Sequence, residues 1–584
     1  ELVRFLAVAT SLPALRWMGP PAEQDRAALA FAQHHPLPPL LASVLARLDV
    51  EPGNVAGYLS PTLRALMPDP DTLRDMPKAA DLLASAVQRK ERIAIFADYD
   101  VDGGASAALL SSWLGAFGIQ ATLYVPDRLT EGYGPNVPAM DRLGAAHDLV
   151  VCVDCGTLSH EPVAAAVARG ARVMVLDHHL GGETLPDAAA AVVNPNRQDE
   201  DTPLGYLCAG GVVFLLLVAA NRALRARGVS GPDLLPFLDL VALATVADVA
   251  PLQGLNRAFV RQGLKVMGQR NRVGLTALAD VAGLTSAPSA YHLGYLLGPR
   301  INAGGRIGKA DMGARLLSTH DPSRAAAMAE ELDRLNRERR DIEATVLDAA
   351  MQQAEERGFD APLVWAAGEG WHPGVVGIVA ARLKEAANRP AVVIGIDAGT
   401  GKGSGRSVAG IDLGAAIATC TREGLFTKGG GHKMAAGLTV DAHAIPDAMD
   451  RLAALLQRQG AHLLGPRDVR LDGALSVAGA SIDLVEQLEM AGPFGAGVSA
   501  PRVAIPSVRI DYAKRAGTNH LSLALRDGTA GRLQAIAFGA FDTPLGPALE
   551  AHNGALFHVA GRLEIDDWGG RGEVKLRIED AARA

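Results

Sequence analysis

The sequence predicts an α/β protein in which a parallel-sheet region leads through a long helix to a smaller α/β region and then to a small β-barrel. Three observations support this architecture. Apolar strands alternate with helical stretches over residues 76–320, charged residues with helical periodicity cover 321–358, and short strands with glycine turns dominate 463–584. Strand–helix alternation is typical of parallel sheets joined by right-handed crossovers. At 584 residues, the chain is long enough for several domains.

The chain divides into segments where these patterns change. The first residues mix short helices with proline-rich turns and indicate an N-terminal appendage that leads into the sheet. The charged segment would form a connector helix of about 50 Å, because an α-helix rises about 1.5 Å per residue. Its apolar seam is too short to favour the alternative, a coiled-coil partner helix. The expected segments are the appendage, the parallel-sheet domain, the connector, a second α/β domain and a β-rich domain, at 1–75, 76–320, 321–358, 359–462 and 463–584.

The β-rich end contains five short apolar stretches separated by glycine turns, with one helical piece at 482–490. Five short strands suit an OB-fold, which commonly binds single-stranded nucleic acid, but other small barrels fit the pattern almost equally well. The strands are expected near 501–510, 519–526, 531–538, 555–565 and 573–578.

Composition resembles that of ordinary soluble proteins, with 49% hydrophobic and 21% charged residues. A net charge of −8 excludes a globally basic nucleic-acid binder, so any nucleic-acid contact must come from a local basic groove. Four cysteines are too few for a disulfide framework, which indicates a reducing, cytoplasmic setting. The longest apolar run, 207–220, is shorter than the roughly 18 residues of a membrane span, so no membrane association is expected.

One acidic run is the most informative motif. Asp98, Asp100 and Asp102 occupy alternate positions directly after an apolar strand predicted over 92–96. If the strand carries through, the three carboxylates share one face, and a cation that takes hard oxygen ligands would relieve their repulsion. A solvated acidic turn explains this run, taken alone, about equally well.

Two further predicted strands end in polar residues. The strands at 149–153 and 173–176 are followed by Asp154 and by an Asp-His-His run at 177–179. Open parallel sheets bind ligands at the carboxyl ends of their strands, so these groups should meet the acidic run. Asp248 is a fourth candidate, because a carboxylate inside an apolar run is normally paired or metal-bound. Carboxylates with one or two imidazoles suit Mn²⁺ or Mg²⁺, and zinc is less favoured without thiolates.

This ordered series of motifs resembles the DHH phosphoesterase superfamily. Two glycine-rich turns downstream, at 403–407 and 429–432, are similar to those of its companion DHHA1 domain. Further stretches resemble, more narrowly, the RecJ family of bacterial single-strand-specific 5′→3′ DNA exonucleases, which favours the OB-fold for the β-rich end. The resemblance extends from about residue 14 to the end and rests on the stretches 15–17, 126–134, 245–252 and 298–306.

The resemblance implies a centre of two Mn²⁺ or Mg²⁺ ions. Asp154 is the expected bridge, since one carboxylate can bind two ions through its two oxygens. Asp98 would bind an ion directly or support the other ligands, and Asp177 and His179 would orient ligands or the scissile phosphate. The expected metal ligands are Asp98, Asp100, Asp102, Asp154, His178 and Asp248, and the catalytic set adds Asp177 and His179.

The glycine-rich turns would bind phosphates, because glycine lets the backbone approach closely and an arginine or histidine is directly attached. Such turns are otherwise simply flexible, and a lone arginine is more often a surface charge. The expected substrate-binding residues are Arg128, Arg300, Asn302, Arg306, Ser404, Arg406, Gly430, Gly431 and His432.

The implied function is that of a monomeric two-metal exonuclease that degrades single-stranded DNA from the 5′ end to mononucleotides, in recombination and repair. Single-strand-binding protein and a helicase are the implied partners. One alternative is a small-substrate phosphodiesterase acting on oligoribonucleotides or cyclic dinucleotides, which would need neither the appendage nor the β-rich end. A manganese pyrophosphatase would lack the acidic run and the glycine-rich turns. A non-catalytic DNA-binding relative would have lost ligands that are all present here.

Overall fold

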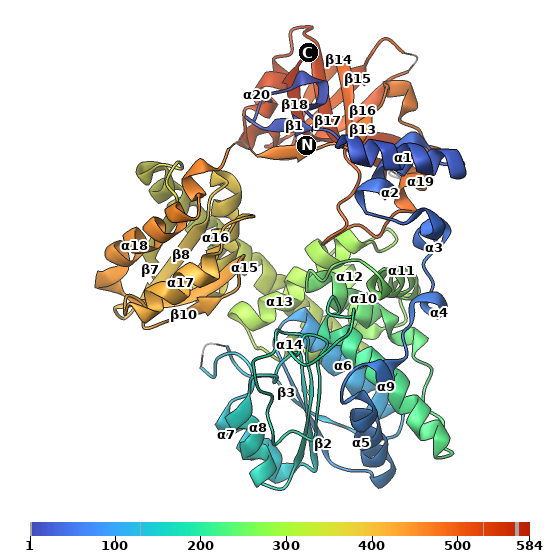
Figure 1. Ribbon diagram of the computed structural model, residues 1–584, viewed down its shortest axis with the longest axis vertical. Helices are drawn as coiled ribbons and strands as arrows, with labels where there is room; N and C mark the ends of the chain where they lie inside the picture. The colour runs from blue at the N-terminus through green and yellow to red at the C-terminus, as the bar shows by residue number, and fades with distance from the viewer. Residues whose placement is uncertain (1–2, 129, 466, 530, 567–571) are drawn as a thin grey trace.

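The computed structural model describes residues 3–128, 130–465, 467–529, 531–566 and 572–584. The chain forms three lobes, which we call the parallel-sheet lobe (strands β2–β6), the second lobe (β7–β11) and the barrel lobe (β13–β18). Figure 1 shows the parallel-sheet lobe at the bottom, the second lobe at the left and the barrel lobe at the top, with both marked chain ends in the barrel lobe.

The parallel-sheet lobe has strands in the order β3-β2-β4-β5-β6, and every neighbouring pair is parallel. The predicted strands at 92–96, 149–153 and 173–176 are present as β2, β4 and β5. These three strands are almost wholly buried, as expected for apolar runs covered on both faces. The bounds are β2 (Ile93–Ala97), β3 (Thr122–Tyr124), β4 (Leu149–Val153), β5 (Arg172–Leu176) and β6 (Ala191–Val193).

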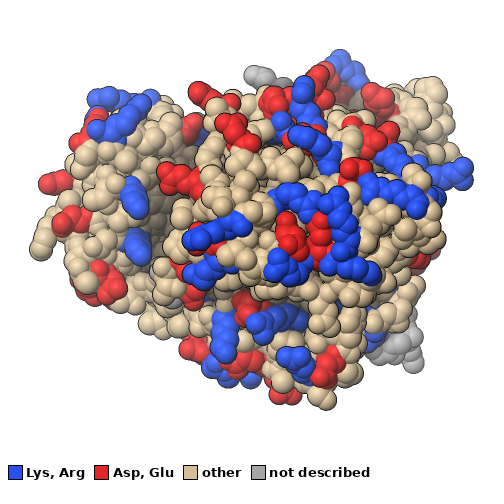
Figure 2. All heavy atoms as spheres, turned by 90° about the horizontal axis from the view of Figure 1, so that it is seen from below, with Lys and Arg blue, Asp and Glu red and all other residues tan. Residues whose placement is uncertain are grey.

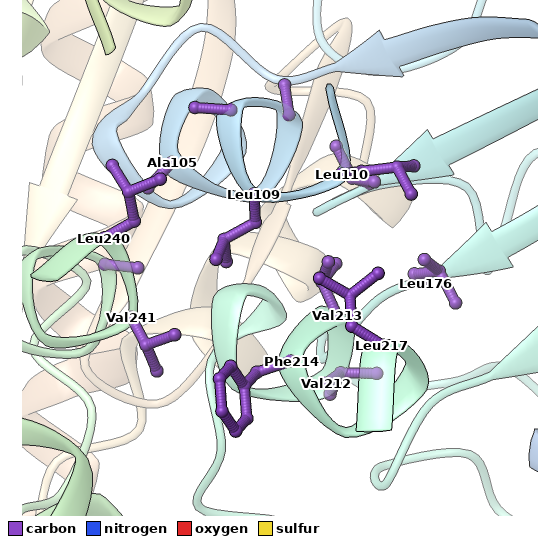
Figure 3. Packing of buried hydrophobic residues seen from close by; sticks show 14 of the residues in the cluster. Ala105, Leu109, Leu110, Leu176, Val212, Val213, Phe214, Leu217, Leu240 and Val241 are labelled. Carbon is purple, nitrogen blue, oxygen red and sulfur yellow. The ribbon is translucent and has the colours of Figure 1, made fainter. Parts of the chain in front are cut away.

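Helices α6 (Val101–Gly115), α9 (Ala209–Ala226) and α10 (Leu238–Ala247) pack together beside this sheet. Figure 3 shows aliphatic side chains such as Leu109 and Val213 meeting between them. Among the described residues, α9 alone is long and apolar enough to cross a membrane, with mean hydropathy 1.5, but 67% of that window is buried inside the lobe. It therefore packs as a core helix does. Further helices are α4 (Leu63–Leu66), α5 (Met76–Arg89), α7 (Val137–Ala146), α8 (His160–Ala168), α11 (Leu255–Gly268), α12 (Val273–Val281), α13 (Gly298–Ile307) and α14 (Met312–Ser318).

The connector helix predicted over 321–358 is α15, which spans Pro322–Arg357. Asp321 caps its N-terminus by accepting from two backbone N–H groups of the first turn. The early residues of α15 pack in the core of the parallel-sheet lobe, and the late residues pack against α16 (Pro373–Ala387) and β7. The helix therefore joins the two α/β lobes.

The second lobe has strands in the order β10-β11-β9-β8-β7, of which β7 and β8 are parallel and the other pairs antiparallel. The stretches 403–407 and 429–432, expected as turns, lie mostly in β9 and β10. A Cβ at Gly401, Gly403 or Gly405 would meet a core side chain at 2.7–2.9 Å, so these glycines make room for the apolar core. The bounds are β7 (Val364–Glu369), β8 (Ala391–Asp397), β9 (Thr400–Arg406), β10 (Lys428–Gly431), β11 (Ala435–Asp441), α17 (Leu413–Arg422) and α18 (Ile445–Arg458).

The C-terminal strands close into a barrel in the order β14-β15-β16-β18-β17, with β17 pairing back to β14. All five predicted strand positions and the predicted helix near 482–490 are present. The closed five-stranded barrel confirms the expected OB-like fold. The bounds are β13 (Gly473–Ala474), α19 (Ile482–Glu489), β14 (Val503–Ala516), β15 (His520–Arg526), β16 (Leu533–Ala537), α20 (Leu545–Glu550), β17 (Phe557–Asp566) and β18 (Glu573–Arg583).

The N-terminal appendage packs mostly on the barrel lobe before the chain enters the parallel-sheet lobe. Strand β1 (Arg16–Met18) pairs in parallel with β12 (Asp468–Arg470). The fully buried Trp17 donates from Nε1 to Asp580 Oδ2 at 2.6 Å. The apolar side chains of α2 (Pro39–Arg47) join the barrel core, because the barrel offers the apolar surface that they need. Helices α1 (Ala22–His34) and α3 (Val55–Leu59) belong to the same segment.

A buried arginine joins the barrel lobe to the parallel-sheet lobe. Arg257 on α11 is 2% exposed and donates to the carbonyl oxygens of Tyr58, Ala491 and Gly492 at 2.8–3.0 Å. Its guanidinium carbon lies 3.7 Å from the centroid of the Tyr58 ring. Burial lowers the pKa of Arg257 to about 10, so these contacts must offset the desolvation of the charge.

Candidate active site

A turn and a helix, not one strand, present the three aspartates of the acidic run. Strand β2 ends at Ala97, and Asp100 caps α6 by accepting from the backbone N–H of Gly103 at 3.0 Å. Asp102 lies in the first turn of α6. The expectation that the carboxylates share a face because they alternate along a strand is therefore wrong. A Cβ at Gly103 would lie 2.4 Å from the carbonyl oxygen of Asp98, so this tight entry into the helix requires glycine.

Asp102 and Asp154 are the most deeply buried acids of the site, each 1% exposed. Asp102 accepts from the backbone N–H groups of Ala209 and Gly210, both at 2.7 Å, at the N-terminus of α9. The positive end of that helix dipole favours the carboxylate. Asp154 follows β4 with a φ of 60°, a left-handed conformation that is costly for a residue with a side chain. The surrounding backbone thus fixes both acids in place.

His178 lies among acids from three different elements. Its Nε2 is 3.2 Å from Asp154 Oδ1, 3.6 Å from Asp102 Oδ2 and 3.7 Å from Asp248 Oδ2. Asp248 is the C-terminal cap of α10 and so comes from a helix end. The centre therefore gathers side chains that follow β4 and β5 with side chains from α6 and α10.

The candidate ligand atoms form three overlapping groups, within each of which they lie within 4.8 Å of one another. Asp154 and His178 each belong to two groups, as ligands around neighbouring cations would. Asp98 Oδ1, Asp154 Oδ1 and His178 Nε2 are buried and make no hydrogen bond within the described chain. These unpaired oxygens and one imidazole fit Mn²⁺ or Mg²⁺. The groups are Asp98 with Asp100 and Asp154, Asp102 with His178 and Asp248, and Asp154 with His178 and His179.

Crowding of buried acids changes their protonation. Burial and the charge of Asp100 raise the pKa of Asp98 to about 7, and burial with the charges of Asp102 and Asp100 raises the pKa of Asp248 to about 9. Burial, and then the surrounding carboxylates, raise the pKa of Asp154 well above its ordinary range. The metal-free site therefore binds protons near neutral pH, and a divalent cation would displace them.

We expect the metal-free protein to lose stability as the pH rises from about 4 towards about 9. The folded-state pKa values of Asp98 and Asp248 exceed the ordinary value of 3.8, so the folded protein binds more protons than the unfolded chain. That stabilisation is complete below the ordinary pKa and disappears as the groups ionise. Thermal unfolding in EDTA at about pH 6 and about pH 8.5 measures the loss, and Mn²⁺ should restore stability at the higher pH. The prediction fails if the unfolding temperature in EDTA is independent of pH.

Asp177 is committed to hydrogen bonds and supports its neighbours. Its Oδ2 accepts from the backbone N–H and the hydroxyl of Thr157, and its Oδ1 accepts from the backbone N–H of His178 and from His179 Nδ1 at 2.7 Å. Burial alone would raise the pKa of Asp177, but the bonds from His179 and Thr157 lower it to about 2. Burial alone would lower the pKa of His179, but Asp177 raises it to about 9. The pair is therefore an ion pair at neutral pH.

Two residues that contact this pair, Asn194 and Tyr133, are absent from the predicted site. Asn194 Nδ2 donates to Thr157 Oγ1 at 2.9 Å and to the carbonyl oxygen of His179 at 2.8 Å. The hydroxyl of Tyr133 lies 3.1 Å from His179 Nε2. Asn194 directly follows β6 at the same edge of the sheet as Asp154. Because parallel sheets bind ligands at the carboxyl ends of their strands, this position could have been used to predict Asn194 as a site residue. Tyr133 lies in the stretch 126–134 that carries the family resemblance, which was the available signal for it.

No broad positive field covers the face shown in Figure 2. Lysine and arginine side chains gather near its centre, but they enclose acidic ones, in keeping with the net charge of −8. Over the described residues, this face therefore offers no continuous basic groove for a nucleic acid.

Three of the predicted arginines gather where the parallel-sheet lobe meets the second lobe. Burial lowers the pKa of Arg306 and of Arg406, and the charge of Arg128 lowers both further. Arg306 donates to the carbonyl oxygen of Gly374 at 3.3 Å, and Arg406 donates to Ser404 Oγ at 3.0 Å. Within the described chain neither Arg306 nor Arg406 forms an ion pair, so this arginine cluster favours an anion.

The other predicted phosphate ligands are placed differently. Arg300 donates from Nε to Asp333 Oδ1 at 2.9 Å, and Asn302 Oδ1 accepts from the backbone N–H of Val101 at 3.1 Å. Both side chains are therefore engaged in holding helices together. Gly431 is paired with β11, and β11 is paired with β9, so Gly430, Gly431 and the exposed His432 lie two strands from Gly405, beside the arginine cluster.

Comparison with family models agrees with this arrangement. The N-terminal domain of the DHH family matches residues 92–245, the DHHA1 domain matches 360–458, and the RecJ OB domain matches 471–580. The fold and the acidic centre thus define a DHH-family protein with a DHHA1 domain and an OB domain.

Whole-chain relatives narrow the class further. The single-stranded-DNA-specific exonuclease RecJ of Dickeya dadantii is 38% identical and that of Escherichia coli 35% identical, each over 93% of this chain and 96% of the relative. The crystal structure of RecJ with Mn²⁺ from Thermus thermophilus matches with a TM-score of 0.80 and 31% identity, over 98% of this chain and 80% of that chain. This chain belongs to the RecJ family.

Proposed function

We propose that this chain is a metal-dependent exonuclease that degrades single-stranded DNA from the 5′ end to mononucleotides, in DNA recombination and repair. The observation that carries the proposal is the pairing of a buried carboxylate–histidine centre with an arginine cluster in which neither Arg306 nor Arg406 has an acidic partner among the described residues. The relatives, which are named single-stranded-DNA-specific exonucleases, support the choice of substrate.

Two sets of residues would hold the ions. Asp98, Asp100 and Asp154 suit one position, and Asp102, His178 and Asp248 suit the other. Related RecJ structures contain Mn²⁺ in one case and Mg²⁺ in another, which supports either ion. When bound, such ions lower the pKa of a water molecule and neutralise charge on a phosphoryl group.

The protein's own groups would position the phosphate. In the metal-free site Asp177 raises the pKa of His179 to about 9, so this imidazole would offer an N–H donor at the edge of the centre. Asp177 holds that imidazole at Nδ1, which leaves Nε2 directed towards the hydroxyl of Tyr133. A second hydrogen-bonding layer of this kind fixes ring orientation and basicity. His179 would therefore bind a non-bridging oxygen of the scissile phosphate.

The arginine cluster would set the direction of digestion. Burial raises the pKa of Asp98 and lowers those of Arg306 and Arg406, whereas the charge of Arg128 lowers all three, so the cluster borders the acidic centre. Guanidinium groups suit bidentate phosphate contacts. A terminal 5′-phosphate held there would place the first phosphodiester at the centre. Because the substrate is unpaired, a helicase and single-strand-binding protein would supply it. We place the enzyme in the cytoplasm. One copy of the chain would be enough to form the active site.

The test uses one single-stranded DNA with different labels at its two ends. We expect release of the 5′ label as a mononucleotide with Mn²⁺ or Mg²⁺, no release in EDTA, and little release from a blunt duplex. Turnover of dinucleotides or cyclic dinucleotides without attack on the long strand would overturn the proposal in favour of a small-substrate phosphodiesterase. Release of the 3′ label first would overturn the assigned direction.

A further inference from the structure

Two tyrosines form a stacked pair on the surface of the parallel-sheet lobe. Tyr291 and Tyr295 are 56% and 72% exposed, with ring centroids 5.1 Å apart and ring planes inclined by 26°. Within the described chain, neither phenolic hydroxyl has a hydrogen-bond partner, whereas the Tyr206 hydroxyl accepts from the backbone N–H of Leu255. A tyrosine that serves the fold usually buries its ring and satisfies its hydroxyl. This pair does neither.

The backbone beneath the pair is fixed. Residues His292–Leu297 form a π-helical turn that runs directly into α13, and Leu293 and Leu297 on its other side are fully buried. Short π-helical turns are rare and often occur at functional sites. Arg300 donates from Nη1 to the carbonyl oxygen of Leu296 at 2.7 Å while its Nε binds Asp333 on α15. The predicted phosphate ligand Arg300 thus braces the turn that presents the tyrosines.

The same turn packs against the helix end that carries Asp248. A Cβ at Gly294 would lie 3.4 Å from Val246 Cγ1, and a Cβ at Gly298 would lie 3.3 Å from Ala247 Cβ. Val246 and Ala247 are the two residues immediately before Asp248. In Figure 1, α10 and α13 lie on the side of the parallel-sheet lobe that faces the other two lobes. The turn that carries the tyrosines is therefore packed directly against the helix end that carries Asp248.

We infer that Tyr291 and Tyr295 are a base-stacking platform for the single strand a few nucleotides from the scissile phosphate. The inference rests on the proposed function and names a base-binding site for it. The two rings stack on each other through one face each, and the His292 ring packs near-perpendicular to Tyr291 with centroids 5.9 Å apart, so the outer face of the more exposed Tyr295 is the one offered to a nucleobase. Any base has a π-face, so such a site tolerates all sequences, whereas paired bases inside a duplex cannot reach it. A nuclease that reads no sequence needs contacts of this type.

The test compares three variants with the wild type. The double variant Tyr291→Ala/Tyr295→Ala removes both rings, and Tyr291→Phe/Tyr295→Phe keeps stacking while it removes the hydroxyls. Leu235→Ala is the matched control, because Leu235 is 50% exposed and precedes the opposite end of α10. Dissociation constants for a fluorescent single strand are measured in EDTA by anisotropy, and kcat and KM are measured with Mn²⁺.

We expect the alanine double variant to bind the strand about tenfold more weakly and to raise KM by a similar factor, with kcat little changed. The phenylalanine double variant and Leu235→Ala should behave as the wild type. Unchanged affinity and KM in the alanine double variant, with a wild type that cleaves single strands, would overturn the inference alone. Failure of the wild type to cleave or bind single strands would instead overturn the proposed function.

If the alanine double variant does not fold, the inference can still be tested by removing one base at a time from the DNA strand. Single abasic nucleotides are placed at successive positions from the 5′ end of the strand. The wild type should lose affinity when one defined position near the end lacks its base, and the milder variant Tyr295→Leu should lose that sensitivity. Equal affinity of the wild type for every abasic strand would overturn the platform.

Discussion

Replacing Asp154 with asparagine should lower exonuclease activity by a factor on the order of a thousand or more while the protein remains folded. Asp154 belongs to the ligand group of one cation position, and its Oδ1 lies 3.2 Å from His178 Nε2 of the other, so its loss would weaken both positions. Divalent cations supply several kcal/mol of charge stabilisation in phosphoryl transfer, and each 1.36 kcal/mol is about a tenfold change in rate. Single-turnover cleavage of a 5′-labelled strand with saturating Mn²⁺ measures the effect.

Stability separates this chemical effect from a folding defect. Metal-free Asp154→Asn should unfold at or above the wild-type temperature, because the change removes one of several repelling buried acids. Mn²⁺ should raise the unfolding temperature of the wild type and have little effect on the variant. Asp280→Asn, on α12 and paired with the surface residue Arg270, is the matched control and should retain full activity. Near-wild-type cleavage by Asp154→Asn would eliminate the two-cation centre.

Replacing Arg257 with alanine should destabilise the attachment of the barrel lobe by about 3 kcal/mol. The change leaves the carbonyl oxygens of Tyr58, Ala491 and Gly492 without their donor, and each buried acceptor left unsatisfied costs about 1–3 kcal/mol. It also removes the cation that packs on the Tyr58 ring. Urea unfolding and limited proteolysis near residue 491 measure the loss.

A neighbouring arginine provides the control for this experiment. Arg261 lies one turn later on α11 and donates to the carbonyl oxygen of Leu59 at 2.7 Å, but its contact with the carbonyl oxygen of Met490 is long, at 3.4 Å, and it is less buried than Arg257. Arg261→Ala should therefore cost much less and leave the proteolysis pattern unchanged. Equal effects of the two substitutions would show that Arg257 has no special part in holding the lobes together.

The chemistry of the centre could be predicted from sequence because parallel strands end at one edge of a sheet. That rule alone brings Asp154 and the Asp177–His179 run together. The periodicity of charged and apolar residues likewise predicts α15 to within one residue at each end. Both inferences depend on the pattern of residues within one short segment, and that pattern decides whether the segment forms a strand or a helix whatever the rest of the chain does.

The features that could not be predicted from the sequence depend on contacts between segments far apart in the chain. Asp102 is held by a backbone N–H group of α9 that is 107 residues away, and Arg300 is held by Asp333 across a helix interface. The residues next to Asp102 and Arg300 in the sequence give no indication of these partners. A run of glycine usually indicates a turn, whereas the glycines of β9 lie in a strand where neighbouring side chains fill the missing volume. The place of the N-terminal segment is equally invisible in its own residues, because the barrel that receives it lies at the other end of the chain.

The bond between Trp17 and Asp580 has a consequence for synthesis of the protein. The two residues are 563 positions apart, yet both belong to one small lobe. At about 5–20 residues per second, a ribosome would need roughly half a minute to two minutes to make the second after the first. During that time the parallel-sheet lobe can fold, while the tryptophan and the leucines of α2 remain without their partner surface. Until Asp580 has been made, the newborn chain therefore displays an apolar segment of the kind that chaperones bind.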